Sequence, residues 1–159
     1  MGFKITRSRI INEVVTEVPS AEYPILEFED YKRICIEEGD SPAPSETDQH
    51  IYPSYHETVG RDRFMTSPIE ARVEELHHAH IWQEGCCWEE DDEDDDSLKV
   101  QWACTSDSYV VYSYFIDKDG DHHFYIIDYC SDGAHGLIAN QKQVLDWANQ
   151  AERHKLRNI

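Results

Sequence analysis

Apolar and polar residues along the first forty positions follow two different periods. Residues 3–7 alternate strictly, which predicts a β-strand. Between residues 20 and 38 the apolar positions recur every three to four residues, which predicts an amphipathic helix. The apolar stripe comprises Ile25, Leu26, Phe28, Tyr31, Ile34 and Cys35. Pro24 suits the first turn of this helix, where no amide partner is lost, and Gly39 is a natural helix end.

The second half of the chain carries the signals of a sheet. Segments rich in β-branched and aromatic residues, or alternating in polarity, predict strands at 76–82, 98–104, 109–117 and 124–130. Residues 118–121, Lys-Asp-Gly-Asp, predict a tight hairpin turn between the last two strands. Alternation puts Leu76, His78, His80 and Trp82 on one face of the first strand, and His77, Ala79 and Ile81 on the other.

A closing helix is predicted from Asn140, as its N-cap, to about Arg157. Its predicted buried face comprises Val144, Leu145, Ala148 and Ala151, with Trp147 at the border. The proline-containing polar stretch at 40–60 predicts a long loop. This order of elements predicts an α+β fold, in which a small antiparallel β-sheet packs with an N-terminal and a C-terminal helix. We expect a single domain over residues 1–159.

The charge balance constrains the possible partners. The chain has 33 acidic against 14 basic residues, which gives a formal net charge of -19. Affinity for nucleic acid comes mainly from Lys and Arg, so this balance opposes RNA binding by the average surface and favours a basic partner. Eight consecutive acids at 89–96 predict a solvated, mobile hairpin tip.

Cysteine usage and hydropathy indicate the compartment. The five cysteines are odd in number and contain no Cys-x-x-Cys pair, which predicts reduced thiols. The N-terminus lacks the apolar run of a signal peptide, and no stretch reaches the length of a transmembrane helix. We therefore expect a soluble, cytoplasmic protein with no membrane partner.

Histidines at 77, 78 and 80 form the first cluster that could carry chemistry. His78 and His80 share a face of the predicted strand, so both imidazoles can reach one ligand, and a His-x-His pair is also a common metal-binding element. Three alternatives stay open: acid–base chemistry or RNA contact, a metal site completed by His135 or an aspartate, and a polar strand end that faces solvent.

Two further groups contain residue types that act on phosphate or protons. The first comprises Asp107, Tyr109, Tyr112 and Tyr114. A phenol can stack on a base or donate to a phosphate, although strand tyrosines more often bury their rings and keep their hydroxyls wet. The second is Asp128 with His135, which lies in a glycine-containing loop after a strand and suits an exposed acid or base near neutral pH.

Taken in order, short motifs along nearly the whole chain resemble the YafO family of bacterial toxin–antitoxin toxins. They comprise Phe3-Lys4, residues 28–33, Gly60-Arg61-Asp62, Pro68, His78-Ala-His80-Ile81, Thr105-Ser-Asp107, Val111-Tyr112, Ile126-Ile127 and His135, followed by a final helix. Their collinear order is more specific than any single motif. Compared with the family, the chain carries inserted material at about 40–58 and 84–97, which we expect to be flexible.

The resemblance implies a RelE-like fold, mRNA cleavage at the ribosome and a cognate antitoxin. The matching polar positions are Arg61, Asp62, His78, His80, Thr105, Asp107, Tyr112 and His135. We predict an endoribonuclease that works by transesterification without metal or other cofactor. The predicted catalytic residues are His80 and His135 as the acid–base pair and Tyr112 as a positioning or protonating group. The predicted substrate-binding residues are Arg61, which would bind phosphate, together with His78, Thr105 and Asp107.

A different class of function stays open on the charge alone. An acidic immunity or antitoxin-type protein would bind and block a basic partner without any catalysis. Expression separates the two, because an inhibitor is harmless alone and a toxin is not. The nuclease prediction requires basic groups to gather locally, and the candidates are Lys4, Arg7, Arg9, Arg61, Arg63, Arg153, Lys155 and Arg157.

Overall fold

The computed structural model describes residues 2–90 and 98–159, and its strands form one five-stranded sheet in the order β1-β5-β4-β3-β2. The strands are β1 (Phe3–Arg7), β2 (Val59–Phe64), β3 (Leu76–Ile81), β4 (Tyr109–Ile116) and β5 (His122–Cys130). The helices are α1 (Arg9–Glu17), α2 (Glu22–Gly39), α3 (Glu46–Gln49), α4 (Ile69–Val73), α5 (Ala134–Ile138) and α6 (Gln141–Asn158). Short 3-10 turns lie at Pro19–Ala21 and Gln101–Ala103.

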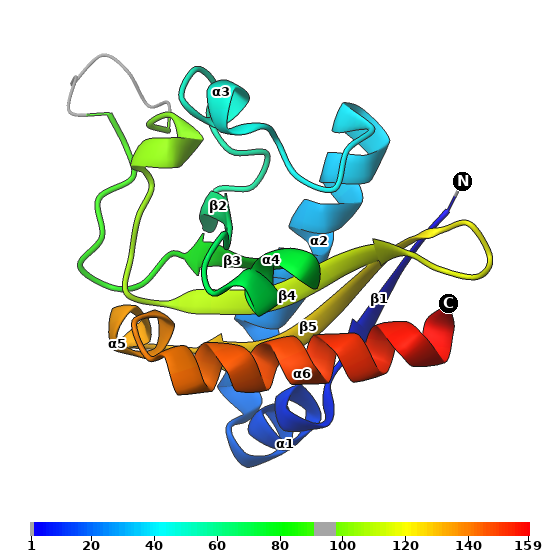
Figure 1. The fold of residues 1–159 in the computed structure, drawn as a ribbon. Helices are drawn as coiled ribbons and strands as arrows, with labels where there is room; N and C mark the ends of the chain where they lie inside the picture. The colour runs from blue at the N-terminus through cyan, green and yellow to red at the C-terminus, as the bar shows by residue number, and fades with distance from the viewer. Residues whose placement is uncertain (1, 91–97) are drawn as a thin grey trace.

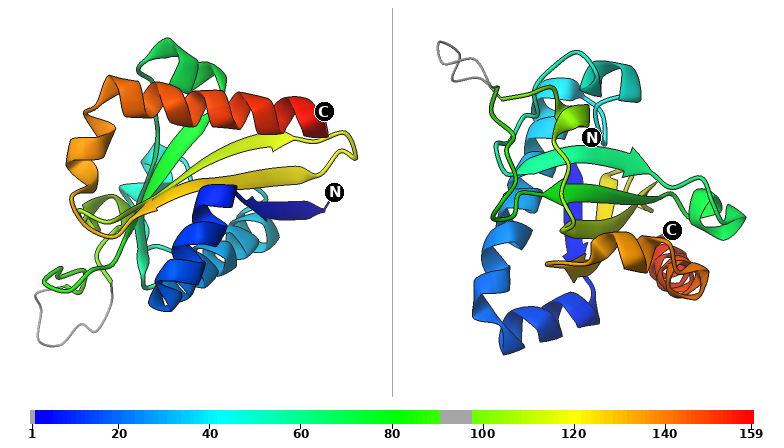
Figure 2. Two further views of the ribbon diagram at one scale, coloured as in Figure 1. Left: turned by 90° about the horizontal axis from the view of Figure 1, so that it is seen from below. Right: turned by 90° about the vertical axis from the view of Figure 1, so that its left-hand side faces the viewer.

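The sheet separates two layers of helices. Helices α1 and α2 cover one face, and α6 runs along the other (Figures 1 and 2). Val110 and Ile126 belong to the core beneath α2, whereas Val111 and Ile127 belong to the core beneath α6. Consecutive residues of β4 and β5 thus enter opposite cores, which is the period-two alternation of strands that are buried on both faces.

The α+β class and the flanking helices are confirmed, and the arrangement fits a small RelE-like fold. The sheet is mostly antiparallel as predicted, and at one edge β1 pairs in parallel with β5. Residues 3–7 contain no local signal for this pairing, since their partner strand lies near the other end of the chain. The predicted hairpin turn between β4 and β5 is confirmed, with Gly120 at φ 79°, a region that favours glycine.

The strand predicted at 98–104 is wrong. These residues make isolated β-bridges and a 3-10 turn in its place. The side chain of Gln101 enters the protein interior, where Nε2 donates to the Tyr31 hydroxyl at 2.7 Å and to the Gly60 carbonyl at 2.9 Å. Burial in this loop does not follow the alternating polarity, because Gln101 and Cys104 are buried and the two residues between them are not.

The sequence patterns do not predict α1 or β2. Ser8 begins α1, because its hydroxyl accepts a hydrogen bond from the Ile11 amide at 3.1 Å. β2 starts inside the segment that was expected to be a loop. That segment is packed against the body of the protein by Gln49, whose side-chain amide pairs with the main chain of Asp62 at 2.9 and 3.0 Å.

The closing helix begins as predicted. The side chain of Asn140 accepts a hydrogen bond from the Gln143 amide at 3.2 Å, which closes the first turn of α6. The border position predicted for Trp147 is wrong, because its side chain is 1% exposed and its Nε1 donates to Asp128 on β5 at 3.0 Å. The indole therefore links α6 to the sheet.

Replacing Asn140 with alanine is expected to lower the free energy of unfolding by about 1 kcal/mol, because an amide at the start of α6 loses its partner. Urea denaturation followed by circular dichroism measures this difference. Asn149→Ala, on the exposed side of the same helix, is the matched control and should be neutral or slightly stabilising. Equal losses in both variants would show that the cap contributes nothing.

Part of the acidic region remains undescribed. The mobile hairpin tip predicted from the acidic run falls largely on residues 91–96, outside the described residues. The same holds for much of the insertion expected at 84–97. Across residues 2–90 and 98–159, no helix has both the length and the apolar character needed to cross a membrane.

Candidate functional site

Three neighbouring strands bring polar side chains to the face of the sheet that also carries α6. Tyr109 lies two residues before Val111 on β4, so both side chains point to this face. Pairing between strands adds His78 opposite Val111, His80 opposite Tyr109 and Arg63 opposite His78. The ring of Tyr109 lies 4.7 Å from that of His78 and 4.4 Å from that of His80, measured between centroids.

Helix α5 places His135 at the edge of this cluster. The carboxylate of Asp107 accepts hydrogen bonds from the Gly133 amide at 3.0 Å and the His135 amide at 2.8 Å, and it contacts His135 Nδ1 at 3.1 Å. The bond from the His135 amide is the largest of the effects that hold the pKa of Asp107 below its usual range. The ionised carboxylate therefore orients the imidazole, whose side chain is 71% exposed.

The hydroxyl of Tyr109 completes a hydrogen-bonded series with Asp107 and His135. It lies 3.0 Å from Nδ1 and 3.1 Å from Nε2 of His135. Because Asp107 engages Nδ1–H, the phenol is the donor to Nε2. Burial, and next the charge of Asp107, raises the pKa of Tyr109 to about 12, so the phenol keeps its proton at neutral pH.

His80 is close to His135 but is built for a different task from the one predicted. The two ring centroids lie 6.4 Å apart. Nδ1 of His80 accepts a hydrogen bond from the Ser106 amide at 2.8 Å, which leaves the proton on Nε2. Burial, followed by the charges of His78, Arg61 and His135, lowers the pKa of His80 to about 3. The imidazole is therefore neutral at physiological pH and acts as an N–H donor, not as half of an acid–base pair.

Two arginines on β2 supply positive charge to the same face. The guanidinium of Arg61 lies 4.4 Å from the centre of the Trp102 ring, and its Nε donates to the Trp102 carbonyl at 2.8 Å. Burial, and next the charge of Arg63, lower the pKa of Arg61, although an arginine stays charged in proteins. In the part of the chain that the structure describes, neither Arg61 nor Arg63 has a carboxylate partner.

Tyr112 is not brought to this group, which corrects the predicted catalytic set. It lies three residues after Tyr109, so the strand turns it to the α2 face, where its side chain is fully buried. Its hydroxyl lies between Lys32 Nζ and Asp62 Oδ1, at 2.6 Å from each. Asp62, another position matched to the family, is buried in the same network. A substrate at His135 cannot touch either side chain.

The remaining predicted residues lie at or near the cluster. His78 is 6% exposed, and burial is the main reason that its pKa is lowered to about 4. Thr105 is exposed, and its carbonyl accepts from Trp88 Nε1 at 2.8 Å. Asp128 does not pair with His135 as the sequence indicated, because it accepts from Trp147.

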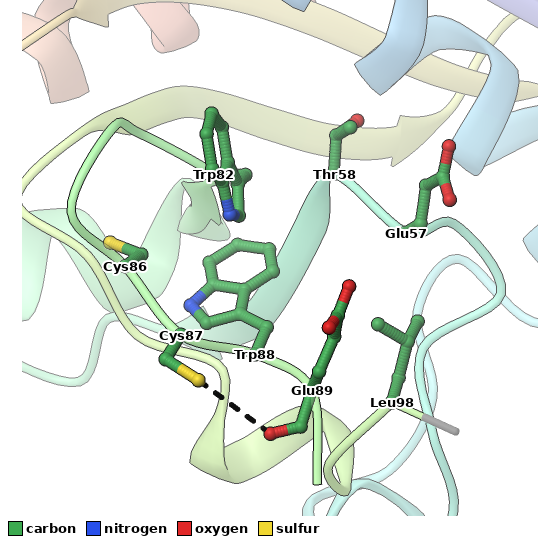
Figure 3. Close-up of a pocket in the computed structure, with 8 residues that line it drawn as sticks. All are labelled: Glu57, Thr58, Trp82, Cys86, Cys87, Trp88, Glu89 and Leu98. Carbon is green, nitrogen blue, oxygen red and sulfur yellow. Dashed lines mark hydrogen bonds between the residues drawn. The ribbon is translucent and has the colours of Figure 1, made fainter. Parts of the chain in front are cut away.

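A cavity of about 350 Å³ lies beyond the end of β3 and is unsuited to phosphate. Trp82 and Trp88 lie beside each other in it, with the adjacent thiols of Cys86 and Cys87 at one end (Figure 3). The ionisable groups on its opposite side are the carboxylates of Glu57 and Glu89. No Lys or Arg side chain lines it. An anionic substrate is therefore expected on the His135 side of β3.

Lys4 and Lys155, two of the basic residues that were expected to gather, are paired with carboxylates elsewhere. Lys4 Nζ contacts Asp117 at 2.9 Å and Asp119 at 2.6 Å, and Lys155 Nζ contacts Glu74 at 2.8 Å. These ion pairs leave neither ammonium group free to bind a phosphate. The local positive charge at the candidate site therefore comes from Arg61 and Arg63.

Comparison with known families gives one match. The family model described as "Toxin YafO, type II toxin-antitoxin system" matches residues 36–156. The chain belongs to this family. Membership makes it a toxin of a type II toxin–antitoxin system, with an antitoxin as its partner, and favours this class over the acidic inhibitor. No curated protein and no solved structure gives a significant match.

The YafO match contains every residue predicted for the site. It begins within α2, so the similarity expected at Phe3-Lys4 and 28–33 stays a prediction. The predicted site residues omit Tyr109, which the sequence analysis named only within a group of candidate tyrosines. Its spacing could have identified it, because residues three apart on one strand face opposite sides, so Tyr109 and Tyr112 cannot serve one site.

Proposed function

We propose that this YafO-family toxin is a cytoplasmic, metal-independent endoribonuclease that cleaves ribosome-bound mRNA at the Asp107–His135–Tyr109 series. One observation carries the proposal. An exposed imidazole, oriented by an ionised carboxylate, lies beside a buried N–H donor and on the face that carries two arginines without carboxylate partners among residues 2–90 and 98–159. These are the parts that phosphodiester transesterification requires.

In the proposed reaction, the ribose 2′-hydroxyl replaces Tyr109 as the donor to His135 Nε2. The imidazole takes the 2′ proton, and the 2′-oxygen attacks the adjacent phosphorus. The bond to the 5′-oxygen breaks, a 2′,3′-cyclic phosphate forms, and His135 returns the proton to the departing oxygen. Nε2–H of His80 and the hydroxyl of Tyr109 donate to the phosphate oxygens as negative charge develops, while Arg61 provides positive charge.

The net charge of -19 explains why the ribosome belongs in the proposal. A strongly anionic protein captures free RNA poorly, because counterion release needs many cations. Arg61 and Arg63 supply few such contacts. A ribosome that presents the mRNA removes the need for the toxin to bind RNA unaided.

Induced expression without the antitoxin gene tests the proposal. We expect growth to stop within minutes and primer extension to reveal new 5′ ends in translated mRNA. In vitro, purified toxin should cut mRNA on translating ribosomes far faster than the same RNA alone, with EDTA-treated toxin and untreated toxin equally active once Mg²⁺ is restored for the ribosome. Normal growth with intact transcripts would refute the endoribonuclease, and equal cleavage of free RNA would refute dependence on the ribosome.

A further inference from the structure

A second concentration of positive charge lies at the β1 edge of the sheet, away from His135. There, the start of α1 and the last turns of α6 enclose a cavity of about 460 Å³. Four arginines and one histidine line it: Arg7, Arg9, Arg153, Arg157 and His154. The chain has only 14 basic residues and a net charge of -19, so four arginines around one cavity oppose the overall composition.

The arginines of α6 are the cations available to a ligand. Arg7 is held by Glu22 and Glu29, and Arg9 pairs with Glu13 on the surface. Arg157 Nε donates to the main-chain carbonyl of Arg153, and across residues 2–90 and 98–159 neither guanidinium contacts a carboxylate. Planar guanidinium groups that contact no carboxylate favour oxyanions, which they bind through paired N–H donors.

Backbone donors add to the same cavity. Arg9 and Ile10 form the first turn of α1, where amides have no partner inside the helix. Among the described main-chain hydrogen bonds, neither amide donates to a carbonyl. The hydroxyl of Ser8 is not free, because it caps Ile11 and donates to the Ile127 carbonyl.

His154 indicates which kind of oxyanion fits. Its ring stacks on Tyr125 with centroids 3.8 Å apart, and the residue is 9% exposed. Nε2 of His154 lies 3.0 Å from Nε2 of His123, whose Nδ1 lies 3.3 Å from Asp117 Oδ2. Hydrogen bonding, chiefly from Lys4, holds the pKa of Asp117 well below its usual range, so the ionised carboxylate accepts a hydrogen bond from His123 Nδ1–H.

The order of donors along this series fixes the state of His154. His123 Nε2 must accept, and it lies 3.0 Å from both His154 Nε2 and the Thr6 hydroxyl. Because two unprotonated nitrogens would repel at this distance, His154 Nε2 carries its proton and His154 Nδ1 is left as an acceptor. Burial and the neighbouring His123 and Arg157 lower the pKa of His154 to about 4, which keeps it neutral at physiological pH. Nδ1 has no hydrogen-bond partner among the described residues. A ligand with one O–H donor and anionic oxygens would therefore complement the groups that line the cavity.

We propose that this cavity binds a phosphate group that retains a P–O–H, namely inorganic phosphate or the terminal phosphate of a nucleotide. Arg153, Arg157 and the first amides of α1 bind the anionic oxygens, and the P–O–H donates to His154 Nδ1. An internal phosphodiester has no such proton and fits less well. The site is independent of cleavage at His135 and remains if that chemistry is absent.

Isothermal titration calorimetry on the full chain tests the site, with protein produced as the His135→Ala variant to avoid toxicity. Three probes separate the sources: inorganic phosphate, a dinucleotide with a 5′-phosphate, and the same dinucleotide without it. Dimethyl phosphate serves as the anion that lacks an O–H. We expect saturable binding of the first two and at least about tenfold weaker binding of the others.

The double variant Arg153→Gln/Arg157→Gln should weaken phosphate binding by at least about tenfold. Arg33→Gln, which removes a surface arginine from α2, should bind phosphate as the parent does. Thermal unfolding by circular dichroism verifies that both variants fold. Absence of saturable phosphate binding, or equal binding by the folded double variant, overturns the site. Equal binding of dimethyl phosphate overturns the role of His154.

Discussion

Replacing His135 with alanine is expected to abolish toxicity and to reduce the rate of RNA cleavage by about 10²–10⁴-fold, the usual contribution of a positioned acid–base group. The loss arises because the imidazole is the exposed proton acceptor on this face, whereas His80 is neutral and already engaged with Ser106. Growth after induction and primer extension on cellular mRNA measure the two effects.

The control is His122→Ala. His122 is the first residue of β5, and its partly buried imidazole is hydrogen-bonded to Tyr114, away from the site. This variant should remain toxic. The toxicity of Asp107→Asn should lie between those of His135→Ala and His122→Ala. The asparagine side chain can still accept hydrogen bonds from the first amides of α5, but it lacks the charge that orients His135. Full toxicity of a folded His135→Ala protein would remove this residue from the mechanism.

Replacing Lys32 with methionine is expected to lower the free energy of unfolding by about 3–5 kcal/mol, a large share of the roughly 5–15 kcal/mol typical of a domain. The Lys32 ammonium is fully buried, and its three contacts are Asp62 Oδ2 and the Tyr112 hydroxyl at 2.6 Å and the Pro42 carbonyl at 2.7 Å. Methionine fills similar space but leaves the buried Asp62 carboxylate without its cation. Urea unfolding in the His135→Ala background measures the loss.

Lys118→Met is the matched control, because Lys118 is exposed and has no carboxylate partner among the described residues. It should change stability by less than about 0.5 kcal/mol. Burial alone would raise the pKa of Asp62, but the Lys32 charge and the hydrogen bonds reverse this and lower it. The ion pair therefore stabilises at neutral pH, and its contribution is lost as the pH falls through the pKa of Asp62 in the folded protein. A Lys32→Met protein as stable as the control would show that the network contributes little.

The contrast between these two predictions follows from the two faces of the sheet. On the α2 face, Lys32, Asp62 and Tyr112 are buried and hydrogen-bonded to one another, so substitution should affect folding. On the α6 face, His135 is exposed, and Arg61 and Arg63 have no acidic partners in the part of the chain that the structure describes, so substitution should affect chemistry. Tyr109 and Tyr112 belong to the same strand and differ in role because alternate residues enter different layers.

Much of the fold could be predicted from local patterns. Alternation predicted β1 and β3, richness in β-branched and aromatic residues predicted β4 and β5, helical periodicity predicted α2 and α6, and Gly120 marked the hairpin. Patterns of this kind report the burial of nearby residues, which local geometry fixes. They failed at 98–104, where alternating polarity occurs in a packed loop. They also gave no sign that β1 pairs in parallel, because its partner strand is distant in sequence.

By itself, the sequence determined the family, the α+β class and the residue types available for chemistry, because these depend on composition, order and short-range periodicity. The tertiary structure alone decided which side chains act together. It joined Asp107, Tyr109 and His135 from a loop, a strand and a helix, and it removed Tyr112 to the opposite core. Pairing between distant strands and the proton state of a buried histidine depend on contacts across the whole molecule, and no local pattern of residues encodes them.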